Sequence, residues 1–157
     1  MLVLEKNAQS EIIEELVKDL GNNRSSLLEI LQGIQKRYNF ISDFAQQEVA
    51  RLLNIHPVEV YSTISFYSFL HSKPIGRNIV RLCRTISCNM KGQKNIETAV
   101  IKELGINFGE TTKDRRITLE YTNCLGMCDV APAMLVNERV YTKIDPETAV
   151  KILKEIK

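Results

Sequence analysis

The spacing of four cysteines constrains this chain more than any other feature. They form two short pairs, Cys83 with Cys88 and Cys124 with Cys128, and 35 residues separate the pairs in a chain of 157 residues. The opening segment, residues 1–6, turns polar too early for a secretory signal, so we expect a cytoplasmic protein. In a reducing cytosol, clustered cysteines hold a metal or do redox chemistry more often than they form structural disulfides.

Four interpretations of the cysteines are open on spacing alone. A zinc site needs four ligands, but its usual pairs are C-x2-C, and intervals of four and three residues fit that poorly. Disulfides or a thiol switch need an oxidising context or a C-x-x-C motif, and neither is visible. Four unconnected buried thiols conflict with the loop-like residues between them. A 2Fe-2S cluster needs four thiolates, two to each iron, and two separated pairs match that demand.

The residues around the cysteines suit an anionic cluster. The basic residues nearby in the sequence are Arg81, Arg84, Lys91 and Lys94. Arg84 lies inside the first pair and is the best candidate for tuning the potential of a cluster. Backbone amides at the start of the helix expected after Cys88 are further candidates. Gly126 lets the backbone approach the sulfurs, and Met127 contributes to an apolar cover.

Residues 10–67 are expected to form four short helices, because polar caps there precede apolar residues at helical spacing. Gly21 is expected to end the first helix, and Glu29 completes the spacing of a capping box at the second. The residues expected at the helix starts are Ser10, Ser26, Ser42 and Pro57. Residues 1–71 are therefore interpreted as a helical bundle.

The pattern changes after residue 71. A proline and a glycine within residues 72–78 predict a linker. The expected strands are residues 78–83, 116–121, 134–136 and 139–141, and the expected helices are 92–104, ended by Gly105, and one capped by Asp145. This order predicts a thioredoxin-like α/β domain over residues 79–157, and an α+β chain as a whole.

Charge and hydropathy exclude two kinds of partner. The chain has 21 Lys and Arg against 19 Asp and Glu, a net +2, which is too small an excess to neutralise the phosphates of a nucleic acid. The most apolar stretch, residues 64–70, is far shorter than the roughly 18 apolar residues that suggest a membrane helix. We therefore expect neither nucleic-acid binding nor direct membrane insertion.

Several motifs together resemble a known family. They are Leu82-Cys83-Arg84 through Cys88, Gly109-Glu110-Thr111-Thr112, Cys124-Leu125-Gly126-Met127-Cys128, Ala131-Pro132 and, upstream, Phe66-Tyr67. The family is the thioredoxin-like 2Fe-2S ferredoxins, a type of small subunit in NADH dehydrogenase and in NAD(P)-linked hydrogenases and formate dehydrogenases, including electron-bifurcating ones. The likeness covers the chain from about residue 10. One departure is Arg115, where the family commonly has a glycine; it should alter a turn and not the cluster.

The resemblance implies that Cys83, Cys88, Cys124 and Cys128 ligate one 2Fe-2S cluster. It also implies that the bundle docks on a larger flavoprotein subunit, which binds FMN and NAD(H) and carries an iron-sulfur cluster of its own. A further iron-sulfur subunit of the hydrogenase, formate dehydrogenase or complex I type is expected in the same assembly. The chain itself would transfer single electrons without substrate chemistry. Two alternatives stay open: a structural docking subunit whose cluster is off the electron path, and a thiol-based redox sensor.

Overall fold

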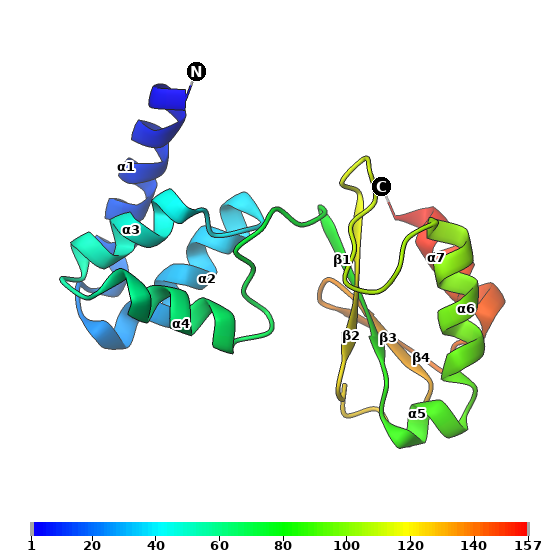
Figure 1. Ribbon diagram of the computed structural model, residues 1–157. Coiled ribbons are helices and arrows are strands. Elements are labelled where there is room, and N and C mark those ends of the chain that lie inside the picture. Colours follow the sequence, from blue (N-terminus) through cyan, green and yellow to red (C-terminus); the bar gives the residue numbers. More distant parts are fainter. Residues whose placement is uncertain (1, 157) are drawn as a thin grey trace. The chain divides into compact units, whose positions relative to one another are not determined.

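A computed structural model describes residues 2–156, and of residues 2–6 it describes the backbone alone. We expected no secretory signal in residues 1–6, and the side chains of these residues are outside the part of the chain that the structure describes. The chain divides into two compact units, Met1–Pro74 and Ile75–Lys157. Figure 1 follows the chain from the helical unit, drawn in blue to green, into the unit that contains the sheet. Within residues 2–156 no helix is both long and apolar enough to span a bilayer.

Helices of the first unit pack around one apolar core. They are α1 (Leu2–Leu20), the short 3-10 helix η1 (Arg24–Ser26), α2 (Leu27–Tyr38), α3 (Asp43–Leu52) and α4 (Pro57–Phe66). Each α-helix contributes a fully buried side chain to the core, namely Ile13, Ile30, Val49 and Val60. Burying such a side chain stabilises the fold by about 1.5–3 kcal/mol, so the apolar stripes hold this unit together.

Of the expected helix starts, Ser10 is wrong in position, whereas Ser26 is the N-cap residue of α2 as expected but lacks the expected capping hydrogen bond. Ser10 lies inside α1, and its hydroxyl donates to Glu48 Oε1 at 2.7 Å. Ser26 makes no side-chain cap bond; its hydroxyl donates to the Leu20 carbonyl oxygen, and the preceding η1 is capped by Asn23. A serine hydroxyl bonds whichever acceptor packing brings near. Ser26 and Glu29 therefore have the sequence spacing of a capping box, but Ser26 does not form the capping hydrogen bond.

The other helix boundaries of this unit are confirmed. Ser42 Oγ accepts a hydrogen bond from the Ala45 N–H at the start of α3, and Pro57 occupies the first turn of α4. Gly21 ends α1 with a φ of +100°, and its N–H donates to the Val17 carbonyl oxygen at 2.9 Å. Glycine adopts this left-handed conformation without steric cost.

The second unit is a four-stranded sheet with two long helices on one side (Figure 1). Its elements are β1 (Asn78–Cys83), α5 (Ile86–Met90), α6 (Gln93–Leu104), β2 (Ile117–Thr122), β3 (Ala133–Val136), β4 (Arg139–Thr142) and α7 (Pro146–Glu155). The strand order is β2-β1-β3-β4. β1 runs parallel to β2 and antiparallel to β3. The expected strands and long helices are confirmed within a residue or so, whereas α5 was not expected.

The two faces of this sheet differ in polarity. Val80, Leu82 and Leu119 are buried in a core to which α6 and α7 also contribute. Arg81 and Glu120 alternate with them along β1 and β2, and their side chains form an ion pair of 2.9 Å. Side chains point alternately to the two faces of a strand, so one face is an apolar core and the other carries a paired charge.

The end of the expected linker belongs structurally to the second unit. Gly76 is buried, and its N–H donates to Thr118 Oγ1 at 2.6 Å. A Cβ atom at this position would lie 2.8 Å from the Ile117 carbonyl carbon, closer than real Cβ atoms come. Glycine is therefore required here by a close approach to β2, and Asn78, the last residue of the expected linker, already begins β1.

Arg115 has a φ of +53°, in the left-handed region that favours glycine. Beside it, Asp114 Oδ1 accepts hydrogen bonds from the Thr112 hydroxyl and from the Arg116 N–H. These two bonds hold the pKa of the Asp114 carboxyl below its usual value. The turn precedes β2 and so lies at the opposite end of that strand from the cysteines, as expected for a departure that alters a turn and not the cluster.

Candidate metal centre

The two cysteine pairs lie at one end of the sheet because β1 and β2 are parallel neighbours. Cys83 ends β1, and its partner in the strand register is Thr122, the last residue of β2; Cys124 follows two residues later. Parallel strands bring their carboxyl ends to the same edge of a sheet. The Arg84 N–H donates to the Thr122 carbonyl oxygen at 3.1 Å, which extends this pairing beyond β1. Figure 1 shows α5 and the segment after β2 at this end.

Cys83 and Cys88 are buried side by side, with exposed fractions of 2% and 1%. Cys88 lies within α5, not just before a helix as expected. Burial raises the pKa of the Cys88 thiol, and the adjacent Cys83 sulfur raises it further. Burial acts in the same direction at Cys83, but hydrogen bonds from Thr85, Cys88 and Leu125 together outweigh it, and the pKa of the Cys83 thiol is lowered. The first pair thus consists of two adjacent thiols in a dry site.

Cys124 and Cys128 are exposed. The Cys124 sulfur accepts a hydrogen bond of 3.3 Å from the Gly126 N–H, and Gly126 has a φ of +75°. Met127, expected as an apolar cover, is itself 36% exposed. Within the described part of the chain, no three His, Cys, Asp or Glu side chains are already gathered closely enough for a metal ion. The structure therefore packs Cys83 and Cys88 together and leaves Cys124 and Cys128 exposed at the same end of the sheet.

Hydrogen-bond donors point at sulfurs in both pairs. The Gly126 amide donates to Cys124 at 3.3 Å. The backbone amides of Thr85 and Leu125 lower the pKa of the Cys83 thiol, and that of Ala133 acts to lower the pKa of the Cys88 thiol. In each pair the first cysteine accepts from the amide two residues further along the chain. Such donors stabilise thiolates, and thiolates are the ligands of a 2Fe-2S cluster. The donors present therefore fit that group.

Arg84 connects the two cysteine segments. Its guanidinium lies 5.3 Å from the centre of the Tyr121 ring, and two of its nitrogens lie 3.4 Å from Asn123 Oδ1. Tyr121 in turn stacks on Phe108, with ring centres 3.8 Å apart and planes within 7°. Because Arg84 follows Cys83 directly and Asn123 precedes the second pair, these contacts tie the start of one segment to the start of the other.

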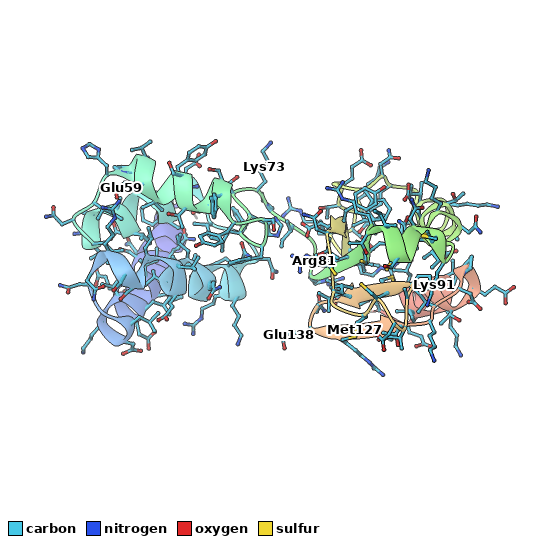
Figure 2. All side chains as sticks on the ribbon, turned by 90° about the horizontal axis from the view of Figure 1, so that it is seen from below. Glu59, Lys73, Arg81, Lys91, Met127 and Glu138 are labelled. Atoms are coloured by element: carbon cyan, nitrogen blue, oxygen red, sulfur yellow. The ribbon has the colours of Figure 1, made fainter. Side chains whose placement is uncertain are left out.

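Arg81, Lys91 and Lys94 differ in their contacts, and their expected role beside an anionic cluster stays a prediction. Arg81 is paired with Glu120, so its charge is already offset. Lys91 Nζ donates to the Asp129 carbonyl oxygen at 3.3 Å and so ties the end of α5 to the second segment. Lys94 is exposed in the first turn of α6. Figure 2 looks onto this end of the sheet and labels Lys91 and Met127.

Sequence reasoning missed the residues that contact the sulfurs. Thr85 has its Oγ1 atom 3.3 Å from Cys83 Sγ. Adjacency to the cysteines was an available signal for Thr85 and Leu125. No local signal marked Ala133, since it reaches Cys88 only through the antiparallel pairing of β3 with β1.

The structure also bears on the alternatives for the cysteines. All four are free thiols, and no disulfide joins them. The exposure of Cys124 and Cys128 contradicts the interpretation that all four are buried as small hydrophobic residues.

Comparison with known proteins agrees with these features. A family model described as thioredoxin-like 2Fe-2S ferredoxin matches residues 13–157. An NADH-quinone oxidoreductase subunit of Buchnera aphidicola subsp. Acyrthosiphon pisum (strain APS) is 38% identical over 151 residues, 96% of this chain and 93% of that protein. The subunit of the same name from Escherichia coli (strain K12) is 33% identical over 150 residues, 96% of this chain and 90% of that protein.

A solved structure adds likeness in fold. The crystal structure of an NAD+-reducing NiFe-hydrogenase in the air-oxidised state aligns with a TM-score of 0.70 at 24% identity, over 80% of this chain and 22% of that longer chain. The predicted fold class and the predicted kind of cofactor are both confirmed by the family match. With nearly its whole length matched by the family model and by these relatives, the chain belongs to the thioredoxin-like 2Fe-2S ferredoxin family.

Proposed function

We propose that this chain is an electron-transfer subunit that holds one 2Fe-2S cluster on Cys83, Cys88, Cys124 and Cys128. It works within a multisubunit NAD(P)H-linked oxidoreductase: a hydrogenase or formate dehydrogenase, including the electron-bifurcating kind, or an NADH:quinone oxidoreductase. A larger partner subunit binds FMN and NAD(H) and carries its own iron-sulfur cluster, and a further iron-sulfur subunit completes the path. The relatives support this setting, because both are named as subunits of NADH-quinone oxidoreductases.

The observation that carries the proposal is the set of hydrogen-bond donors beside sulfurs of both cysteine segments at one end of the sheet: the Thr85 hydroxyl lies 3.3 Å from Cys83 Sγ, and the Gly126 amide donates to Cys124 at 3.3 Å. The amides of Leu125 and Ala133 act with them, since they act to lower the pKa of the Cys83 and Cys88 thiols respectively. Thiols that served only as small apolar side chains would not require donors from three separate segments. The donors come from Thr85 just before α5, from the loop after β2 and from β3, so the fold brings them together. The arrangement supports four thiolates held by protein amides, which is the environment that tunes iron-sulfur clusters.

The two cysteine pairs differ in their access to solvent, which suits them to different roles at the site. A bound 2Fe-2S cluster supplies one-electron transfer, and a flavin on the partner would handle the two electrons of a hydride. Cys83 and Cys88 are shielded from water. Cys124 and Cys128 lie at the surface, where a partner subunit can approach. One side of the site is thus protected and the other is open to electron exchange.

Exposed apolar side chains around this end support docking of the partner. Ile86 and Met90 of α5 are 78% and 83% exposed, and Met127 lies on the neighbouring segment. In the first unit, Val58 and Phe66 of α4 are likewise exposed. Grouped exposed apolar side chains mark interaction sites. We assign the side chains near the cysteines to the flavoprotein contact, and those of α4 to the docking of the bundle.

The direct test is to purify the full chain anaerobically and to measure its iron and sulfide, with absorption and EPR spectra before and after dithionite. We expect iron and sulfide in equal amounts, about two of each per chain, and absorption and EPR spectra that change when dithionite reduces the cluster by one electron. Replacing any of the four cysteines by serine should lower the iron content, whereas Ser87→Ala, inside the first pair, should not. Zinc in place of iron, or absorbance unaffected by dithionite, would overturn the proposal.

The two alternatives give different outcomes in the assembled complex. If the cluster were only structural, a complex containing Cys124→Ser would keep its NADH-driven activity without the cluster. If the chain were a thiol sensor, metal-free protein would cycle between dithiol and disulfide at Cys83 and Cys88 with its function intact. Electron transfer predicts an assembled complex that loses NADH-driven activity when the cluster is lost.

The proposed docking surface near the cysteines is tested separately, by placing charged side chains on it. Ile86→Glu combined with Met90→Glu should reduce co-purification of the flavoprotein subunit while iron content stays unchanged. Val140→Glu is the matched control, since Val140 is also an exposed apolar residue but lies on β4. Equal loss of the flavoprotein from both variants would contradict the assignment of this surface.

A further inference from the structure

Thr85 occupies the N-cap position of α5 but does not cap the helix. Its backbone is extended, as at an N-cap, yet its side chain bonds none of the free amides of α5. In the same position, Ser42 of α3 and Asp145 of α7 accept hydrogen bonds from Ala45 and Thr148. Threonine ordinarily caps in this way. The hydroxyl of Thr85 instead lies 3.3 Å from Cys83 Sγ, so a local stabilisation is given up for a contact with sulfur.

The direction of this hydrogen bond depends on the state of the sulfur. Between a hydroxyl and a thiol, either group can donate. A cysteine that ligates a metal is a thiolate and has no proton, so only Thr85 can then donate. Cys83 is 2% exposed, and in a dry environment a hydrogen bond to a charged acceptor is stronger than in water. Thr85 is therefore placed to act on this sulfur without competition from solvent.

We propose that the Thr85 hydroxyl donates a hydrogen bond to the Cys83 sulfur of the cluster-bound chain and thereby raises the reduction potential of the cluster. This inference rests on the proposed function. Reduction adds negative charge to the cluster and its thiolates, so a donor stabilises the reduced form more than the oxidised form. Thr85 acts through Cys83 and is a positioning residue for the thiolate, not a ligand.

The test is an EPR-monitored redox titration of the iron-loaded full chain. Thr85→Val keeps the shape of the side chain and removes the hydroxyl, and Thr85→Ser restores a hydroxyl. At a fixed ambient potential, Thr85→Val should lower the ratio of reduced to oxidised cluster about tenfold, which is about 59 mV for a one-electron couple. Thr85→Ser should keep the wild-type midpoint. Thr98→Val is the matched control, because the Thr98 hydroxyl bonds the Lys94 carbonyl oxygen within α6.

A wild-type midpoint in an iron-loaded Thr85→Val chain would overturn the inference. Thr85→Ala provides a second chain without the hydroxyl should the valine variant not fold. Loss of iron from both, with normal iron in Thr85→Ser, would assign the hydroxyl to cluster assembly and would also overturn it. A wild-type chain without iron contradicts the proposed function itself, whereas an unchanged midpoint in a loaded variant contradicts only the role of Thr85.

Discussion

The two cysteine segments, residues 83–88 and 124–128, lie at the same end of one sheet but differ in how deeply the fold buries their cysteines. Cys83 and Cys88 are buried, adjacent and supplied with donors, while Cys124 and Cys128 are exposed. The strand order gives the reason: β1 is a central strand and β2 an edge strand. A segment that leaves a central strand is covered by neighbours on both sides. The fold therefore buries one half of the site and leaves the other half exposed to solvent.

Removal of the cluster should show this difference most strongly. A ligand at a hundred times its Kd stabilises the folded form by about 2.7 kcal/mol, or about a hundredfold in an opening equilibrium. We expect amide exchange in residues 124–130 to be slowed by about that much in the loaded chain, and exchange in residues 83–88 to change less. Hydrogen exchange before and after chelation of the iron measures both. An equal change in the two segments would contradict the comparison.

Replacing one cysteine in each segment should separate burial from ligation. Cys88→Ser places a hydroxyl in a dry site and should lower the free energy of unfolding of the metal-free chain by about 1–3 kcal/mol. Cys128→Ser changes an exposed residue and should stay within about 0.5 kcal/mol. Urea unfolding of the metal-free variants measures this, and iron content should fall in both. Similar destabilisation by the two substitutions would show that the segments are equally ordered.

Backbone strain offers a smaller and more local test of the second segment. Gly126→Ala places a side chain at a φ of +75°, where nonglycine residues cost about 1–2 kcal/mol. Gly105→Ala is the control: Gly105 ends α6 at a φ of +65°, and nothing near it would meet the added Cβ. Both variants should lose similar stability in thermal unfolding. Only Gly126→Ala should also lose iron, because a backbone shift that relieves the strain would move the amide of residue 126 away from the Cys124 sulfur; equal iron retention would show that such strain does not reach the site.

The link between the segments should give the smallest effect. Arg84→Gln removes an exposed contact with Tyr121 that is worth about 0.5–1 kcal/mol. Arg139→Gln is matched to it, because Arg139 lies 5.1 Å from the centre of the Tyr141 ring on β4. The two should destabilise the chain alike, but only Arg84→Gln should speed the release of iron to a chelator. Equal release rates would mean that Arg84 does not hold the segments together.

Local patterns predicted much of the second unit. The expected strand at residues 78–83 matches β1 at both ends, Gly105 ends α6, and Asp145 caps α7. Each of these depends on interactions within a few residues. α5 was missed because five residues show no apolar periodicity and do not form a helix without tertiary support. Ser10 and Ser26 were misjudged because their hydroxyls bond partners that packing supplies.

By itself, the sequence determined the type and number of candidate ligands, and its family motifs favoured one kind of cofactor among the interpretations that spacing left open. Two cysteine pairs in a thioredoxin-like order of strands and helices were compatible with a 2Fe-2S cluster, and the resemblance to the family selected it, since ligand type and number are properties of residue identity. Only the tertiary structure decided that Cys83 is buried and that Thr85 turns away from its helix toward the sulfur. The pairing of β1 with β2 and β3 joins residues tens of positions apart, so no local pattern encodes those contacts.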